Sequence, residues 1–191
     1  MQEDAPAPAD RRTAILDAAI EVLSTEGGRG LTHRAIDRRL DLPLGSTANH
    51  FSTRDALFRA VTDRLLELVI VDLEPIPERR LSKDRAAGLI VKYLMDTAHS
   101  DARHRYIAHQ EVLLQSARDH HLGLEVSAAR QRVVDVVTRI LVAAGCDDPK
   151  AHAPGLIALI DGLLIDQLLY SSDPVDSRWL NSQVRRYLAH C

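Results

Sequence analysis

Residues 31–51, LTHRAIDRRLDLPLGSTANHF, form the stretch of sequence that decides the fold. Thr32 is placed to cap a short helix over residues 33–40, because a threonine side chain accepts a hydrogen bond from a free amide at a helix start. After a tight turn, Pro43 suits the first position of another helix that ends near His50. Two short helices joined in this way and backed by a third predict a helix-turn-helix.

The second of these short helices has a slim and polar profile. Ser46, Thr47 and Asn49 are small or polar, and Gly45 and Ala48 add little bulk. A helix that enters the major groove of DNA, which is about 12 Å wide, needs these properties. The segment is therefore predicted to be a recognition helix.

Helical periodicity continues along the rest of the chain. A first helix over residues 11–26 places Ile15, Ala19, Val22 and Leu23 on one face. Prolines, glycines and polar turns divide the remainder at Pro75 and Pro77, at residues 100–101, around Gly123, at residues 145–149 and at residues 171–174. Further helices are predicted over residues 53–73, 82–99, 101–119, 122–144, 149–171 and 175–189. The chain is expected to be all-α, with about nine helices.

The composition limits the classes of protein that fit. The net charge of −3 argues against general nucleic-acid binding, but residues 11–60 carry eight arginines against six acidic residues, a local excess of two positive charges. A weakly basic module on an acidic body fits a protein that touches phosphates at one end. No apolar stretch approaches the roughly 20 residues of a membrane span, so no membrane partner is expected.

Cysteine and histidine usage indicates a cytoplasmic protein without a metal site. Cys146 and Cys191 are expected as free thiols in a reducing cytosol rather than as a disulfide. Five histidines lie between residues 99 and 121, but they lack metal-ligand spacing and neither cysteine joins them. No phosphate-binding loop, nucleophile motif or pair of catalytic carboxylates is recognised, so neither a cofactor nor catalysis is expected.

Four segments, in order, resemble the TetR family of transcriptional regulators. They are RRTAILDAAIEVL from residue 11, THRAIDRRL from residue 32, PLGSTANHF from residue 43 and STRDALF from residue 52. The resemblance covers about 50 residues, and the recognition helix is similar to a subgroup with a PLGSTxNHF pattern. It implies a regulator that binds DNA as a dimer and is released by a small molecule.

The resemblance assigns contacts with the DNA backbone to particular residues. Thr32 and Arg34, at the start of the second helix, are expected to touch phosphates, and so is His50. Arg54, in the position of a family lysine, is expected to approach the DNA backbone from the start of the next helix. Leu44 stands where the family commonly has a lysine near the start of the recognition helix.

Base reading is assigned to the outward face of the recognition helix. Ser46, Ala48 and Asn49 are the candidates, since an asparagine amide can pair with an adenine edge and the alanine methyl can meet a thymine methyl. The full set of predicted DNA-binding residues is Thr32, His33, Arg34, Gly45, Ser46, Thr47, Ala48, Asn49, His50 and Arg54. Exposed surface and helix caps are the alternative reading of the same residues.

The resemblance also implies a division of the chain into functional parts. Residues 1–9 form a flexible arm, residues 10–52 form the DNA-binding domain, and residues 53–191 form a helical-bundle domain for ligand binding and dimerisation. In that domain, residues 53–73 form the connecting helix. Two outward arginines, Arg38 and Arg39, are expected to be solvated, with a pair to Asp37 or Asp41 as the alternative.

Helix 149–171 is apolar on nearly all sides, so it needs cover on all sides. A second subunit is the simplest cover, with helix 122–144 as its partner in a four-helix dimer interface. Gly155 and Gly162 lie seven residues apart, and each costs about 1 kcal/mol of helix stability relative to alanine, which a close helix approach would explain. The alternative is that the helix is only the core of its own domain.

A ligand site is predicted around helix 101–119, which has a mostly apolar stripe with polar handles. Asp161 is expected to face inward from helix 149–171 or to pair with an arginine of a partner subunit. The candidate ligand-binding residues are Tyr93, Tyr106, His109, Gln110, Leu113, Leu114 and Asp161. Plain core packing is the alternative explanation of the tyrosines and leucines.

The preferred function is a dimeric repressor that binds a palindromic operator and is released by an unidentified, largely apolar effector. Two other classes remain open. One is a helical carrier or enzyme that uses the three-helix module for interaction, and it would need a cluster of catalytic or ligand-binding groups. The other is an architectural DNA-binding protein without an effector, which a fully packed interior would favour.

Overall fold

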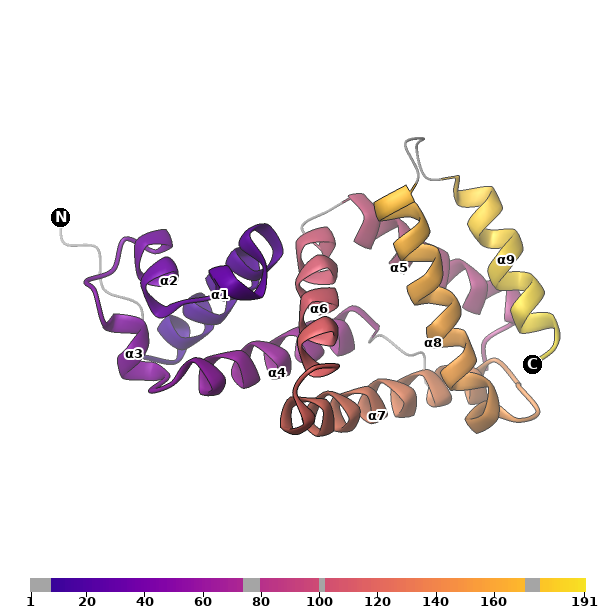
Figure 1. The fold of residues 1–191 in the computed structure, drawn as a ribbon. Helices are drawn as coiled ribbons and strands as arrows, with labels where there is room; N and C mark the ends of the chain where they lie inside the picture. Colours follow the sequence, from indigo (N-terminus) through magenta and orange to yellow (C-terminus); the bar gives the residue numbers. More distant parts are fainter. Residues whose placement is uncertain (1–7, 74–79, 100–101, 171–175) are drawn as a thin grey trace. The chain divides into compact units, whose positions relative to one another are not determined.

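The structure is a computed structural model that describes residues 8–73, 80–99, 102–170 and 176–191. All regular structure in these residues is helical, and they contain no strand (Figure 1), so the predicted all-α class is confirmed. The helices are α1 (Pro8–Gly30), α2 (His33–Arg39), α3 (Ser46–His50), α4 (Arg54–Leu73), α5 (Lys83–His99), α6 (Ala102–Ser116), α7 (His120–Ala143), α8 (Pro149–Ile165), the π-helical turn η1 (Asp166–Tyr170) and α9 (Ser177–Ala189).

Several boundaries differ from the predicted ones. Helix α1 begins at Pro8, so the last two residues of the expected arm are helical, while residues 1–7 lie outside the described residues. A kink at Gly27, whose φ is 69°, divides α1 without ending it. Helix α3 begins at Ser46 rather than at Pro43, since Gly45 turns the chain with a φ of 95°. The breaks predicted at Pro75 and Pro77, at 100–101 and at 171–174 also lie outside the described residues.

The chain forms two compact units. One comprises Met1–Glu67 with His104–Ser127, and the other comprises Leu68–Arg103 with Ala128–Cys191. Helix α6 therefore belongs to the unit that contains the helix-turn-helix, although it lies far away in sequence. This grouping by packing is a different property from the functional division at residues 52 and 53, which stays a prediction.

The apolar face of α1 forms much of the core of the first unit. Ile15, Ala19, Val22 and Leu23 are each at most 1% exposed, as the periodicity predicts. Burying a side chain of this size stabilises the folded chain by about 1.5 to 3 kcal/mol. Helix α2 packs on α1 and α3 packs on α2, so this core positions the helix-turn-helix.

In the second unit, α9 packs along α5, and α8 also packs on α5. Leu180, Val184 and Leu188 follow helical spacing on α9 and are at most 1% exposed. The Tyr187 hydroxyl donates a hydrogen bond of 2.8 Å to the carbonyl of His152. Its ring lies over Gly155, where a Cβ atom would collide with it. The close approach of α9 thus explains Gly155 within a single chain.

Helix Pro149–Tyr170 corrects the expectation about membrane-length segments. Among the described residues it is long and apolar enough to cross a membrane, with a mean hydropathy of 1.4. This finding rests on length and composition alone. A helix in the interior of a folded domain can have the same length and composition. Among its buried residues, Leu156 and Leu164 are each 1% exposed.

The expectation of two free thiols is wrong, because Cys146 and Cys191 form a disulfide. The two Cα atoms lie 4.7 Å apart although 45 residues separate them in sequence. Helices α8 and α9 run out and back between the two cysteines, so the end of α9 returns to the turn after α7 (Figure 1). Residue spacing alone does not reveal this pairing.

Replacing both cysteines by serine should lower the free energy of unfolding of the oxidised protein by about 4 kcal/mol, because the cross-link closes a loop of some 45 residues. Urea unfolding followed by circular dichroism measures the change. Wild-type protein kept reduced serves as the control and should unfold like the variant. Two titratable thiols in the oxidised, denatured wild-type protein would contradict the disulfide.

Candidate nucleic-acid interface

Asp37 anchors the start of the recognition helix. Its carboxylate accepts hydrogen bonds of 2.8 Å from the backbone amides of Gly45 and Thr47, and one of 2.6 Å from the Thr47 hydroxyl. The side chains of Asp37 and Thr47 are both 0% exposed. A buried carboxylate that accepts from the first amides of α3 meets its hydrogen-bonding needs and fixes α3 against α2.

Burial and hydrogen bonding act in opposite directions on this carboxyl group. Burial raises the pKa of Asp37, while the bonds from the Thr47 side chain and from the amides of Thr47 and Gly45 lower it, with a smaller lowering from His33. The net result is a pKa below the ordinary value of 3.8. Asp37 is therefore ionised in the folded protein at neutral pH, which preserves the acceptor geometry.

The anchored helix presents a small, exposed surface. Ala48 and Asn49 are exposed, and Leu44, just before the helix, is 74% exposed. Ser46 is half-buried, and its hydroxyl donates a hydrogen bond of 2.6 Å to the carbonyl of Pro43. Of the predicted base readers, Ala48 and Asn49 thus lie fully open to solvent.

The start of α2 combines exposed and structural groups. Thr32 caps the helix as predicted, since its hydroxyl accepts a hydrogen bond of 3.2 Å from the amide of Ala35. Arg34 is exposed. His33 instead turns inward and donates through Nε2 to the carbonyl of Phe51 at 2.7 Å. The ring of His33 joins the start of α2 to the residue that follows α3.

The structure assigns positioning roles to two residues of the predicted DNA-binding set. Thr47 is buried against Asp37, and the half-buried His33 uses its Nε2 atom on Phe51, so both side chains have structural partners inside the domain. Sequence spacing could not separate these residues from their outward neighbours, because α3 has only five residues. Gly45 is exposed and His50 is half-buried at opposite ends of the same helix.

Arg54 lies at the start of α4 and reaches back to the end of α1. Its guanidinium donates to the carbonyl oxygens of Gly28 and Leu31, the latter at 3.3 Å. The amide of Gly28 donates in turn to the Glu111 carboxylate of α6 at 3.2 Å. One residue after the kink in α1 therefore connects α6 with the start of α4.

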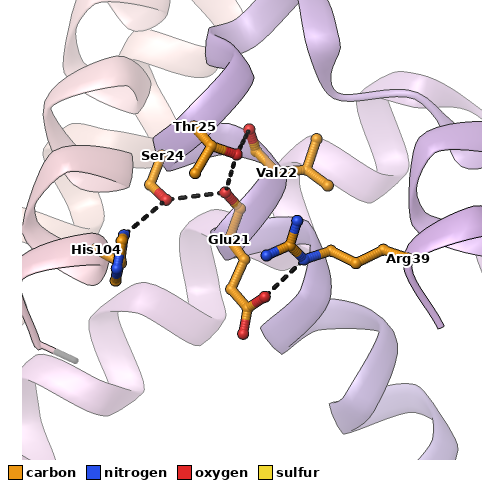
Figure 2. Close-up of polar contacts among 6 residues, drawn as sticks. All are labelled: Glu21, Val22, Ser24, Thr25, Arg39 and His104. Atoms are coloured by element: carbon orange, nitrogen blue, oxygen red, sulfur yellow. Dashed lines mark hydrogen bonds and ion pairs between the residues drawn. The ribbon is translucent and has the colours of Figure 1, made fainter.

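Figure 2 shows two further polar contacts of α1. Arg39 of α2 pairs with Glu21 at 2.6 Å rather than with Asp37 or Asp41, the alternative partners considered from the sequence. Both side chains are exposed, and such a pair contributes at most about 1 kcal/mol. On another side of α1, Ser24 Oγ lies 3.4 Å from Nδ1 of His104 in α6.

The predicted ligand-binding residues fall into both units. Tyr106, His109, Gln110, Leu113 and Leu114 all lie on α6, where Tyr106 is buried and Leu114 is 53% exposed. The Nε2 atom of Gln110 is buried and has no hydrogen-bond partner among the described residues. A buried amide without an acceptor is unusual in a folded protein.

The two remaining candidates lie in the other unit. Tyr93 is half-buried on α5. Asp161, on α8, lies 3.9 Å from Arg130 of the same chain, so an arginine of a partner is not needed to pair with it. Burial raises the pKa of Asp161, and the nearby Arg130 offsets part of that rise.

The fold and the anchored three-helix module define a helical transcription regulator with an N-terminal helix-turn-helix. Residues 81–191 match the family model described as Tetracyclin repressor-like, C-terminal domain. That match spans more than half of the chain, and the chain belongs to this TetR-like family. The identification rests on the C-terminal part, which the sequence motifs did not cover.

Known proteins similar to the chain agree with this assignment. A TetR-family member from Streptomyces coelicolor is 28% identical, with a TM-score of 0.74, and the alignment covers 93% of this chain and 98% of that one. A Saccharomonospora viridis protein solved in complex with choline is 16% identical, with a TM-score of 0.76, covering 95% and 97% of the two chains, and it shares the fold.

A curated relative matches over a shorter stretch. It is an uncharacterised HTH-type transcriptional regulator from the dhlA 5′ region of Xanthobacter autotrophicus, 33% identical over 75 residues. Those residues are 39% of this chain and 37% of the relative, so the match spans little more than a third of that protein.

Asp37→Ala should destabilise the helix-turn-helix by about 2 to 4 kcal/mol, because two amides and a hydroxyl lose their buried acceptor. Since the folded pKa of Asp37 is lowered, its contribution is complete above pH 3.8 and disappears as the pH falls through the folded value. Urea unfolding between pH 3 and pH 7 measures both effects. Asp41→Asn is the control, since Asp41 is exposed at a φ of 51° that asparagine tolerates. Equal stability of the two variants would refute the anchoring role.

Proposed function

We propose that this protein is a ligand-responsive repressor that binds a palindromic operator as a dimer. The observation that carries the proposal is the anchored helix α3, which presents Ala48 and Asn49 to solvent beside a buried Asp37. In this proposal residues 10–52 bind DNA and residues 53–191 bind the ligand and dimerise, in the cytoplasm. On its PLGSTxNHF pattern we further assign the chain to one subgroup of the family as part of this proposal.

DNA recognition in this proposal divides into three roles. Asn49 and Ala48 read base edges, with Ser46 and Gly45 shaping the approach of the helix to the groove. We assign phosphate contacts to Thr32, Arg34, His50 and Arg54, the last through guanidinium N–H groups that the carbonyls of Gly28 and Leu31 do not use. His33 and Thr47 act from inside the domain, where they hold the ends of α3. Exposed Leu44 adds an apolar group at the tip, suited to a thymine methyl.

The function is tested by selecting DNA from a random pool with purified protein and then measuring affinity against salt. Arg34→Ala should weaken binding to all sequences and reduce the salt slope by about 2 per dimer, one phosphate contact for each subunit. Asn49→Ala should instead lose about 1 to 3 kcal/mol of discrimination at one base pair of each half-site. Both effects are read by fluorescence anisotropy.

Arg178→Ala is the matched control, since Arg178 is an exposed arginine on α9, with 96% of its side chain accessible. It should leave both the affinity and the salt slope unchanged. Failure to enrich any palindromic sequence, or salt-independent binding, would overturn the proposed function.

The proposed dimer interface centres on α8. Its exposed positions Ala151, Gly155, Ala158 and Gly162 recur every three or four residues and leave the helix backbone open to close approach. Gly155 is explained by Tyr187 within the chain, but a Cβ atom at Gly162 would meet nothing within 4 Å. A partner helix packed at this point supplies the missing reason for a glycine in the middle of α8.

Helix α7 is a less suitable centre for the interface than the sequence indicates. Between residues 130 and 139 its exposed positions are mainly charged. Charged residues are rare at the centre of protein–protein interfaces. Leu169 and Tyr170, at the end of η1, are 67% and 78% exposed and extend the apolar side of α8. We therefore place α8 at the dimer axis, with α7 as a flanking helix.

Gly162→Arg should convert the dimer into a monomer, because a long cation would replace open space on the proposed contact face. Gly88→Arg is the matched control: Gly88 is also an exposed glycine inside a helix with nothing within 4 Å, but it lies on α5. Sedimentation velocity gives the mass, and circular dichroism checks the helix content. A dimer that survives Gly162→Arg would move the interface elsewhere.

The effector in this proposal binds at α6. The unpaired Nε2 atom of Gln110 calls for a hydrogen-bond acceptor on the ligand, and the apolar neighbours Leu113 and Tyr106 fit its carbon skeleton. His109 and Leu114 of α6 stay in the proposed set, while Tyr93 and Asp161, in the other unit, stay candidates from the sequence alone. The choline complex of a protein of the same fold supports the general idea of a small organic ligand in such a body.

The contacts of α6 with α1 offer a physical route from effector to DNA. Gln110 is followed directly by Glu111, which accepts from the amide of Gly28, whose carbonyl in turn accepts from Arg54. A shift of α6 on ligand binding would change both bonds and with them the junction of α1 and α4. Two half-sites would then no longer fit the dimer, and affinity for the operator would fall.

A further inference from the structure

The two cysteines of the second unit lie beside a histidine. The Sγ atom of Cys146 is 3.3 Å from Nδ1 of His152, and the ligand atoms of Cys146, His152 and Cys191 all lie within 4.8 Å of one another. The three residues come from the turn before α8, the first turn of α8 and the end of α9. His152 is not one of the five histidines between residues 99 and 121 that were considered from the sequence.

Each member of the cluster is held in place by contacts other than the disulfide. The Cys146 amide donates to Leu141 at 3.0 Å, and the Cys191 amide donates to Leu188 at 3.2 Å. The Lys83 ammonium donates to the carbonyl oxygen of Cys191 at 2.7 Å. The turn that carries each cysteine thus has hydrogen bonds that do not depend on the S–S bond.

The imidazole of His152 has its own support. The Tyr187 hydroxyl donates to the His152 carbonyl, and the two rings meet edge to face with centroids 6.3 Å apart. Neighbouring groups that fix the orientation of an imidazole are a regular feature of metal sites. A disulfide needs no imidazole, so the disulfide alone leaves the placement of His152 unexplained.

We propose that, when the disulfide is reduced, Cys146, Cys191 and His152 bind one Zn²⁺ ion. Two thiolates and one imidazole nitrogen are ligands that Zn²⁺ prefers, at about 2.3 Å and 2.0 to 2.1 Å, and they suit neither Mg²⁺ nor Ca²⁺. Cys191 is buried while Cys146 and His152 are half-buried. The fourth tetrahedral position thus faces solvent and takes a water molecule.

The disulfide and the metal exclude each other, because both use the same two sulfur atoms. Reduction by a phosphine and one water breaks the S–S bond, leaves two thiols and converts the phosphine to its oxide. Zinc binding then releases the two thiol protons to the solvent. Both the disulfide and the metal ion would join the end of α9 to the turn before α8. The redox state of the two cysteines therefore selects whether the disulfide or the metal ion makes this connection.

The test titrates Zn²⁺ into full-length protein, freed of metal and reduced with a phosphine, against a chromophoric zinc chelator. We expect one ion per chain in the reduced protein and none in the oxidised protein. Cys146→Ser and Cys191→Ser should each weaken binding by at least about 100-fold, and His152→Ala by at least about 10-fold. Substitution with Co²⁺ should give a sulfur-to-metal charge-transfer band in the wild-type protein and a weaker one in Cys146→Ser.

His190→Ala is the matched control, since His190 is an exposed histidine beside Cys191 that is not a member of the cluster. It should bind Zn²⁺ as the wild-type protein does, and circular dichroism should show equal helix content in all variants. No stoichiometric binding by the reduced wild-type protein, or equal losses in His152→Ala and His190→Ala, would overturn the proposal.

Discussion

The DNA-facing part of this protein depends on one buried carboxylate. Helix α3 has five residues, too few to be stable by itself, and its first amides have no partner within the helix. Asp37 supplies that partner from α2 and stays charged although it is 0% exposed. Because the acceptor is the buried carboxylate of Asp37, side chains on the outward face of α3 are not needed to stabilise the start of the helix. We therefore expect substitutions at Ala48 and Asn49 to leave the fold unchanged.

The helices and the helix-turn-helix could be predicted from the sequence because their signals are local. The Thr32 cap, the Pro43 to His50 segment and the spacing of Ile15, Ala19 and Leu23 act within a few residues of one another. The anchor could not be predicted in the same way, because Asp37 has arginines for neighbours and the pattern indicates a solvated face, with an ion pair as the alternative. The only signal in the sequence was that Gly45 and Thr47 follow Asp37 by eight and ten residues. That spacing indicates a hydrogen-bonded anchor only when the geometry of the turn is known.

What the sequence could not provide depends on contacts between distant segments. The disulfide pairs residues 45 positions apart through the path of two helices, and α6 joins the unit that contains α1 through Glu111 and His104. The location of the candidate site stays a prediction, while the structure adds which of its side chains point inward. Outward and inward members of α2 and α3, such as Arg34 and His33, alternate too closely to separate without coordinates.

The kink at Gly27 is followed directly by Gly28, a residue whose backbone bonds to two other helices. Gly28 uses its amide toward α6 and its carbonyl toward α4, so two helices are tied to the two sides of one small residue. Hydrogen bonds tolerate only a few tenths of an ångström before they weaken, and they lose strength further when bent. A displacement of α6 at Glu111 would therefore bend or lengthen a bond to the same residue that Arg54 holds at the start of α4.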